Sequence, residues 1–359
     1  MSLTTNNKTK TTNHDPDGDP PRLQVEASVI GLRNRCLMHF LERIASTFNE
    51  AGIPLMVLKG AALNLTIYET PGERPMLDLD LMIRPEHVED TSALLQRLGC
   101  RRGEDLVRED FFPRFYYETE YISETVYPMR IDLHVRPFRP LRYSRMVPEH
   151  ALWRRAEPIN IGQATVLIPA VEEMLIHLMV HAAIHGFSEA KWLEDIQRWI
   201  ERYASRRPDR KASSTIDWDR FVSTVAAWGL ALPVREAIAQ LDRRSDHLCP
   251  KKATARLAKL PVSWRDRLAL WHAPRDAADS AGHVFVNVLT TPGLGFVFGY
   301  LRAVVLPDRK HMGEWYRHRH WGWLSGAYLL RWLRPVVRLP SRLWRQLYQN
   351  RNAESLAAN

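Results

Sequence analysis

The clearest pattern along the chain is a strict alternation of apolar and acidic residues between positions 77 and 81. The apolar positions are Leu77, Leu79 and Leu81, and the acidic positions are Asp78 and Asp80. Side chains two residues apart in a β-strand share a face, so the pattern predicts a strand with its leucines toward a core and both aspartates on the opposite face. Adjacent carboxylates repel each other unless a positive charge lies between them. The pattern therefore predicts a cation site.

A short apolar run at residues 55–58 predicts a buried strand just upstream. It leads through Lys59 and Gly60 into a helix that is expected to start at Ala61. Glycine permits a sharp turn and the close approach of a ligand, and the free N–H groups of a helix start attract phosphate. Lys59, Gly60 and Ala61 are therefore candidate nucleotide-binding residues, to which Arg74 adds positive charge. The alternative for Lys59 is a solvated position at a strand end.

A third alternating segment lies within residues 105–136, which are rich in β-formers and are predicted to form strands, the last of them at 126–135. Asp132 and His134 share one face of that last strand, and apolar residues share the other. A cation-binding face is one interpretation of Asp132, and a plain polar outer face is the other. His134 either lines the cleft that receives an acceptor or makes a structural hydrogen bond.

Helical periodicity accounts for much of the remaining chain. The first predicted helix, at 25–51, has apolar positions at Val29, Leu32, Cys36, Phe40, Ile44 and Phe48. Further helices are predicted at 84–98, 217–241 and 252–272, and another is expected to begin at a domain boundary near Pro169. The segment 139–164 is basic and proline-containing, and it is expected to be irregular.

The helix after Pro169 carries a stripe of histidines. His177, His181 and His185 are spaced four residues apart, so they lie on one helix face. Two imidazoles at this spacing can bind zinc, but no His-Glu-x-x-His motif or neighbouring cysteine completes such a site. We therefore favour a polar seam that faces the cleft, with His181 and His185 as possible acceptor-side residues. On the next predicted helix, Asp195 either bridges helices or acts as a base toward an acceptor hydroxyl.

The ordered motifs LKGAAL, RPMLDLDLMI and IDLH, followed by Trp-x-x-Asp-Ile, make the chain similar to a bacterial family of uncharacterised nucleotidyltransferases. This family lies within the DNA-polymerase-β-like superfamily, and the resemblance covers roughly residues 30–330. It implies an α+β fold, in which a small mixed-sheet nucleotidyltransferase domain precedes a larger all-helical domain. The glycine turn of the superfamily is usually Gly-Ser or Gly-Gly, whereas this chain has Gly60-Ala61. Lys59 is the candidate to replace the missing serine contact with phosphate.

The resemblance also implies a chemistry. Asp132 joins Asp78 and Asp80 as a third catalytic carboxylate, and the three are expected to hold Mg²⁺ as a pair of ions. The expected reaction moves a nucleoside monophosphate from an NTP to a hydroxyl or phosphate of a small molecule, peptide or protein, with release of pyrophosphate.

Two other functions remain open at the level of the sequence. One is a glycosyl or other transferase that takes its donor group from a nucleotide-sugar and uses the same aspartates. Its acceptor would be a peptide natural product or a polysaccharide. The other is a non-catalytic scaffold that binds a membrane or a partner.

Length and composition favour a multi-part intracellular protein. The 359 residues are 45% hydrophobic, enough for a normal core. The expected parts are a disordered tail at 1–24, a catalytic domain at 25–168, a helical domain at 169–320 and a basic Trp-rich segment at 321–359. The three cysteines are far apart, no signal peptide is recognisable, and no apolar run approaches the ~20 residues of a membrane span. We therefore expect a cytoplasmic protein.

The net charge of +9 is concentrated near the C-terminus, where residues 301–359 contain 11 Lys or Arg against 3 Asp or Glu. Such a segment is suited to an anionic membrane surface, which would make the protein peripheral at the inner membrane, or to an acidic partner. Packing against the helical domain is the alternative. No motif predicts sequence-specific nucleic acid binding.

Overall fold

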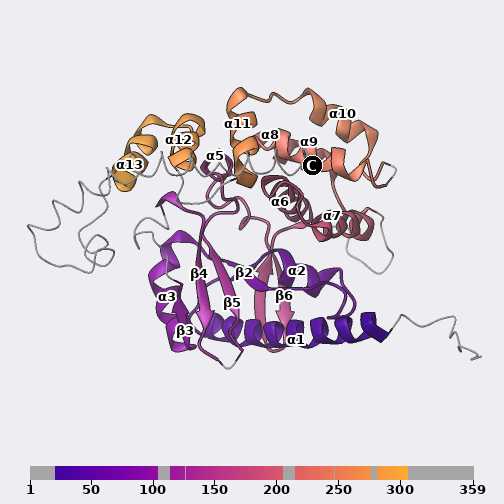
Figure 1. Cartoon of the computed structure of the whole chain (residues 1–359), viewed down its shortest axis with the longest axis vertical. Coiled ribbons are helices and arrows are strands. Elements are labelled where there is room, and N and C mark those ends of the chain that lie inside the picture. The colour runs from indigo at the N-terminus through magenta and orange to yellow at the C-terminus, as the bar shows by residue number, and fades with distance from the viewer. Residues whose placement is uncertain are drawn as a thin grey trace, which may run out of the picture.

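The computed structural model describes residues 21–103, 114–125, 127–204, 215–245, 247–275 and 281–305. Most of the predicted N-terminal tail and all of the Trp-rich segment at 321–359 lie outside these residues. Figure 1 shows a sheet-bearing half built from the N-terminal part of the chain, with a helical half stacked above it. The expected α+β fold, a mixed sheet followed by a helical C-terminal region, is confirmed.

Seven strands form one mixed sheet in the order β3-β4-β5-β2-β1-β7-β6. Their bounds are Met56–Val57 for β1, Asp78–Met82 for β2, Cys100–Arg102 for β3, Glu118–Ser123 for β4, Arg130–His134 for β5, Glu157–Ile161 for β6 and Ala164–Ile168 for β7. The pairs β2–β5 and β1–β7 are parallel, and the other neighbours are antiparallel. The parallel pair β2–β5 at the centre brings two distant segments of the chain side by side.

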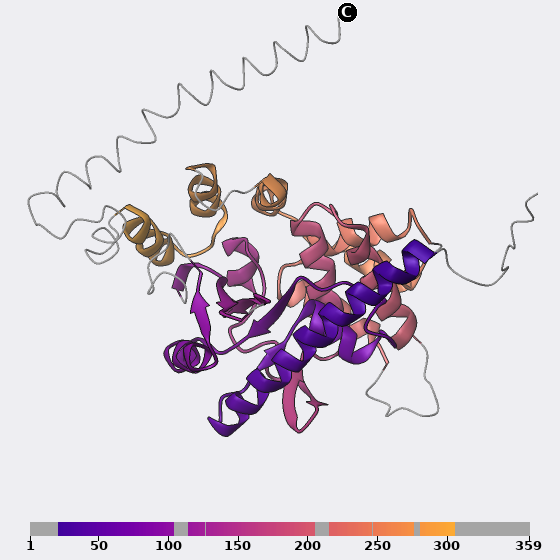
Figure 2. The same cartoon turned by 60° about the horizontal axis from the view of Figure 1, so that its bottom comes forward.

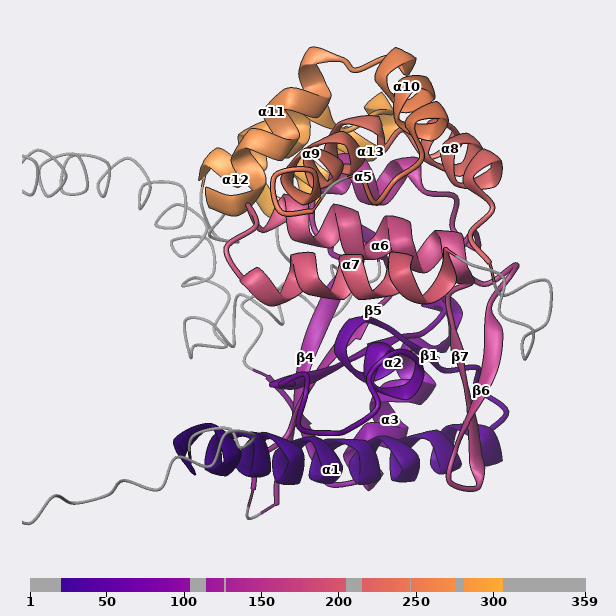
Figure 3. The same ribbon diagram turned by 90° about the vertical axis from the view of Figure 1, so that its right-hand side faces the viewer.

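The described helices of the sheet half are α1 (Pro21–Glu50), α2 (Lys59–Thr66), η1 (Pro85–His87) and α3 (Val88–Arg97). Helix α5 (Leu141–Met146) follows β5 in the chain but packs among the C-terminal helices (Figure 1), where Arg142 Nε donates to Asp266 Oδ1. Helix α1 lies on the side of the sheet away from the helical half, as Figures 1 and 2 show. Its buried face runs from Leu37 to Phe48. The predicted core positions Val29 and Leu32 are 63% and 59% exposed, and Cys36 is also exposed, because the first turns of α1 run past the sheet (Figure 3).

The helical half consists of α6 (Val171–Ile184), α7 (Ala190–Tyr203), α8 (Trp218–Ala227), α9 (Ala231–Leu241), α10 (Lys251–Lys259), α11 (Trp264–His272), η3 (Ala273–Arg275), α12 (Ala281–Thr290) and α13 (Leu294–Val305). Helix α6 lies at its centre, and every residue of α6 except His181 is buried. With α7 it lies directly over the sheet (Figure 3). One hydrophobic core includes residues of both halves, so sheet and helices are packed as one body. No described helix has the length and apolar character to cross a membrane.

Two further expectations about local structure were wrong. The segment 139–164 is not irregular, since it contains α5 and most of the β6–β7 hairpin, whose turn is made by Gly162 at φ +56°. Pro158 is tolerated there because β6 is an edge strand. Leu77 is 55% exposed rather than part of the core, because β2 begins only at Asp78. The short strand β3 had no periodic signal of its own and was not expected.

Candidate active site

The parallel register of β2 and β5 gathers the three predicted carboxylates. Asp80 lies directly beside Asp132, and Asp78 lies beside Arg130. Strand β4 pairs with the other side of β5 and places Glu118 beside His134 and Glu120 beside Asp132. The predicted Asp78, Asp80 and Asp132 therefore share one sheet face with two further glutamates.

Sequence reasoning missed Glu118, Glu120 and Arg130. A usable signal for the glutamates is the alternation in β4, where partly exposed residues such as Glu118 and Glu120 are separated by buried ones. Arg130 is in phase with Asp132 on β5, so it belongs to the same face.

Asp80 is the most enclosed of the three aspartates, with 6% of its surface exposed. Its Oδ1 accepts a hydrogen bond from Lys59 Nζ at 2.6 Å and lies 3.1 Å from His134 Nε2. Burial acts to raise the pKa of Asp80, but Lys59 and His134 outweigh burial and hold the pKa well below its usual value. Burial likewise acts to lower the pKa of Lys59, and Asp80 and Glu118 raise it above its usual value. Asp80 and Lys59 are therefore a charged pair.

The turn that precedes α2 brings Lys59 to this position. Lys59 is the first residue of α2 and has φ +43°, in the left-handed region that a side chain other than glycine rarely adopts. At Gly60 an added Cβ would lie 2.5 Å from Arg74 Nη1, so glycine allows the guanidinium to lie against the turn. The side chain of Ala61 is buried in the core, which leaves its backbone N–H for any ligand contact.

Asp132 and Asp78 share the cation of Arg130. Arg130 Nη2 donates to Asp78 Oδ2 at 2.5 Å, and its Nε lies 3.3 Å from Asp132 Oδ1. Even so, burial together with the negative charges of Glu118, Asp80 and Asp78 raises the pKa of Asp132 to about 7. The face thus has more carboxylates than Lys59 and Arg130 can neutralise, and it is short of positive charge.

This shortage fits a divalent cation held jointly with a substrate. Within the described ranges, no three His, Cys, Asp or Glu side chains are already gathered as a finished metal site. Mg²⁺, however, takes one or two carboxylates and completes its coordination with water and substrate phosphates. The neighbouring oxygen ligands of Asp78, Asp80 and Asp132, with an excess of negative charge, match that mode of binding.

His134 has a supporting position. Its side chain is 1% exposed, and its Nε2 lies between Asp80 Oδ1 and Glu118 Oε2, at 3.1 and 3.4 Å. The hydroxyl of Tyr117 donates to Glu118, and the Tyr117 ring lies 5.7 Å from the imidazole. His134 therefore lies beneath the surface of the site and orients two carboxylates. These contacts match the second interpretation of His134, a structural hydrogen bond, rather than a position that lines the cleft.

The histidine stripe of α6 faces the same site. The rings of His177 and His181 are 6.5 Å apart, those of His181 and His185 are 4.6 Å apart, and Trp192 of α7 lies about 5 Å from the last two. Burial, and next the charge of Lys59, lowers the pKa of His177 to about 3 and that of His185 to about 4, and it places the pKa of His181 well below its usual value. The stripe is therefore an uncharged aromatic wall, and only His181 and His185 are partly exposed.

Asp195 bridges the two halves of the protein. It is 1% exposed and accepts hydrogen bonds from Arg74 Nε and Nη2, each at 2.9 Å, and from the Tyr68 hydroxyl at 2.7 Å. Of the two interpretations of Asp195, a bridge between elements or a base, these contacts match the bridge. Arg74 is directed to Asp195 rather than outward, and only its Nη1 approaches the turn at Gly60.

Comparison with known proteins finds one matching family. The model of a family described as uncharacterised nucleotidyltransferases matches residues 8–244. No curated protein matches the chain. One similar structure is an antigenic nucleotidyltransferase-like protein from Paracoccidioides brasiliensis, 14% identical, with a TM-score of 0.38, covering 63% of this chain and 94% of the other.

A second is ANT(2")-Ia in complex with adenylyl-2"-tobramycin, also 14% identical with a TM-score of 0.38, covering 54% and 98% of the two chains. The family match extends over the whole sheet half, through α6 and α7, and into α9, and it includes every predicted site residue. The chain therefore belongs to the family of uncharacterised nucleotidyltransferases.

Proposed function

We propose that this protein transfers a nucleoside monophosphate from an NTP to a hydroxyl or phosphate group of an acceptor, with Mg²⁺ as cofactor. One observation carries the proposal: Asp78, Asp80 and Asp132 lie together on a face that is short of positive charge. Lys59, at the start of α2, contacts the same face. A triphosphate with its cation supplies the missing positive charge and uses the free N–H groups of the helix start.

Asp78, Asp80 and Asp132 are the residues that would hold Mg²⁺, which when bound neutralises the triphosphate and polarises its phosphorus–oxygen bonds. Lys59 has a second role. In the free protein its ammonium group neutralises Asp80, and in the donor complex it exchanges that bond for a phosphate oxygen. Arg130, which is 46% exposed, can turn from Asp78 toward the same phosphates.

The reaction then needs orientation more than covalent chemistry from the protein. The acceptor oxygen attacks the α-phosphorus, the bond between that phosphorus and the bridging oxygen breaks, and pyrophosphate leaves. The proton of an acceptor hydroxyl passes to a carboxylate of the site, and Asp132 is the candidate because its pKa is raised to about 7. His134 holds Asp80 and Glu118 in place throughout.

The helical half supports the donor site and borders the acceptor. Asp195 fixes Arg74, and Arg74 packs against Gly60, so the pair acts as a positioning device for the phosphate-binding turn. His181, His185 and Trp192 provide an uncharged wall near Lys59 and Asp80. We assign this wall to the acceptor.

A calorimetric titration tests the proposal. The four NTPs and UDP-glucose are each titrated with and without Mg²⁺ into the full-length protein. We expect Mg²⁺-dependent binding of at least one NTP, and its loss in Lys59→Ala. Preference for UDP-glucose would replace nucleotidyl transfer by transfer from a nucleotide-sugar, and binding of none of the five would overturn the proposed donor site.

A further inference from the structure

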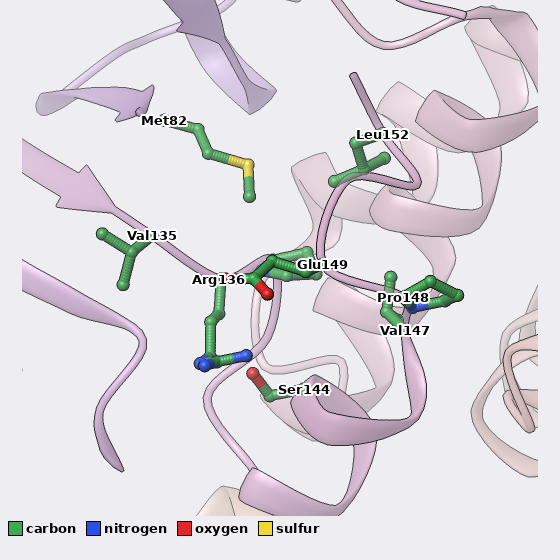
Figure 4. Close-up of a pocket in the computed structure, with 9 residues that line it drawn as sticks. Met82, Val135, Arg136, Ser144, Val147, Pro148, Glu149 and Leu152 are labelled. Atoms are coloured by element: carbon green, nitrogen blue, oxygen red, sulfur yellow. The ribbon is translucent and has the colours of Figure 1, made fainter. Parts of the chain in front are cut away.

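A narrow cavity opens where β2 and β5 end, next to α5 (Figure 4). Its wall includes Met82, Val135, Arg136, Ser144 and Glu149. The cavity has a volume of about 260 Å³, which includes the space at its open mouth. It is smaller than a site for a whole nucleotide and suits one small polar group that enters from outside.

Arg136 differs from the other strongly perturbed arginines. Arg74, Arg130 and Arg155 each contact a carboxylate, which raises the pKa against the effect of burial. For Arg136, burial and then the nearby Arg145 lower the pKa, and Glu149 offsets this only in part. No described carboxylate lies within ion-pair distance of Arg136, and its buried Nε has no hydrogen-bond partner among the described residues.

Ser144 adds a second group of the same kind. It lies on α5 and is 1% exposed, and its Oγ has no hydrogen-bond partner in the described part of the chain. In Figure 4 the hydroxyl and the Arg136 guanidinium point toward each other across the cavity. Arg136 itself is partly exposed, but its Nε–H and the Ser144 hydroxyl are buried, and buried donors are costly unless they are hydrogen-bonded. Beside a guanidinium, both donors favour an oxygen acceptor with negative charge.

The cavity lies close to the catalytic face. Met82 is two residues after Asp80 on β2 and in phase with it, which corresponds to about 7 Å along the strand. Arg136 is four residues after Asp132, and because the chain bends after β5 ends at His134, the two lie at most about 13 Å apart along the chain. A group held in the cavity is thus within the length of a modest acceptor molecule whose other end reaches the carboxylates.

We propose that Arg136 and Ser144 form an oxyanion site that binds a carboxylate or phosphate group of the acceptor, so that the acceptor is an anionic molecule. This identification of the ligand as the acceptor rests on the proposed function, whereas the anion site itself does not. Glu149 at the wall limits the charge that the site accepts to a single small oxyanion group.

Thermal unfolding of the full-length protein tests the site. Melting temperatures are measured in sodium phosphate, sodium acetate and sodium chloride at equal ionic strength, for the wild type, Arg136→Leu, Arg136→Lys and Ser144→Ala. In chloride, Arg136→Leu should melt at or above the wild type, because the buried Nε–H that has no hydrogen-bond partner among the described residues is removed. At about ten times the dissociation constant, one oxyanion should raise the wild-type melting temperature by about 2–4 °C. Arg136→Leu should lose this rise and Arg136→Lys should keep part of it.

The anion response is repeated in Lys59→Ala, because phosphate also suits the turn before α2. The part of the response that depends on Arg136 should persist there, which separates this site from the donor site. An equal response in wild type and Arg136→Leu, or no response to either oxyanion, would overturn the proposal and leave a water-filled cavity. With a known acceptor, Arg136→Leu should raise the KM for the acceptor at least about tenfold and leave donor binding unchanged.

Discussion

Two groups of buried carboxylates in this protein differ in how their charges are compensated. At the start of α6, Glu172 and Glu173 are 2% and 4% exposed, and Arg155 Nη1 donates to both at 2.9 Å. Glu172 also accepts a hydrogen bond from the backbone N–H of Asp217. On the β2–β5 face, in contrast, five carboxylates share the two described cations Lys59 and Arg130, and the pKa of Asp132 is raised to about 7.

The comparison separates a structural cluster from a ligand site. A carboxylate pair that only holds elements together has its partners within the fold, because an unpaired buried charge would destabilise it. A site that receives a cation and a polyphosphate leaves part of its charge uncompensated until they bind. The following predictions test that distinction, from the largest expected effect to the smallest.

Removing charge from the ligand site should abolish function without harming the fold. Asp78→Asn with Asp80→Asn should lower kcat/KM by about a thousandfold and remove Mg²⁺-dependent nucleotide binding. The protein should still fold, but its melting temperature should fall, because Asp80→Asn removes the partner of Lys59 and the relief of repulsion by Asp78→Asn offsets this only in part. Calorimetry and thermal unfolding measure both effects. The control Glu89→Gln with Asp90→Asn neutralises two exposed acids of α3 and should change neither quantity.

Removing charge from the structural cluster should have the opposite outcome. Arg155→Met leaves Glu172 and Glu173 buried without their cation, and it should lower the free energy of unfolding by about 2–3 kcal/mol, a value reduced for the partial exposure of Arg155. Urea denaturation measures this loss. Arg198→Met breaks only exposed pairs and should cost less than about 0.5 kcal/mol. Equal losses in the two variants would remove the distinction between the clusters.

Asp195 should act through Arg74 rather than on the acceptor. Asp195→Asn keeps the shape of the side chain but removes the charge opposite Arg74, and it should raise the donor KM about tenfold with kcat changed less than about threefold. Steady-state kinetics with a varied NTP separate the two parameters. A fall in kcat of a hundredfold or more, together with loss of the acidic limb of the pH–rate profile, would instead identify Asp195 as a general base.

The excess negative charge around Asp132 should make the free energy of unfolding depend on pH. Its pKa is higher in the folded protein than in the unfolded chain, so the folded state binds more protons between about pH 4 and pH 7. Stability of the metal-free protein should therefore fall as pH rises through this window. Asp132→Asn should be more stable than the wild type at pH 8 by about 1–2 kcal/mol and show no such advantage at pH 4. Urea denaturation at both pH values checks this.

Local periodicity predicted much of the site. The two-residue alternation placed Asp78 with Asp80 and, separately, Asp132 with His134 on the same strand face, and the four-residue spacing placed the histidines of α6 in one row. These relations depend on neighbours in sequence, where backbone geometry alone decides which side chains share a face. The catalytic and binding roles of these residues stay predictions.

Relations between distant segments were not predictable in the same way. The pairing of β4 with β5 recruits Glu118 and Glu120, and Arg74 meets Asp195 across 121 residues of sequence. Strand order and register result from packing of the whole core rather than from any one segment. The β6–β7 hairpin was missed because Pro158 and the mostly exposed side chains of the edge strand β6 hide a strand pattern there. The buried residues Val166 and Ile168 lie on the neighbouring inner strand β7.

The conformation of Lys59 has a consequence for laboratory evolution. A side chain with φ +43° costs about 1–2 kcal/mol relative to a comfortable backbone, and glycine at that position would remove the cost. Glycine alone would leave the carboxylate of Asp80 without its cation, so selection for heat resistance should enrich Lys59→Gly only together with a change that neutralises Asp80. Selection that also demands nucleotide turnover should retain lysine. Sequencing the survivors of the two selections would give the frequency of lysine at position 59 in each, and the difference would measure how far the function of the ammonium group outweighs the cost of the strained backbone.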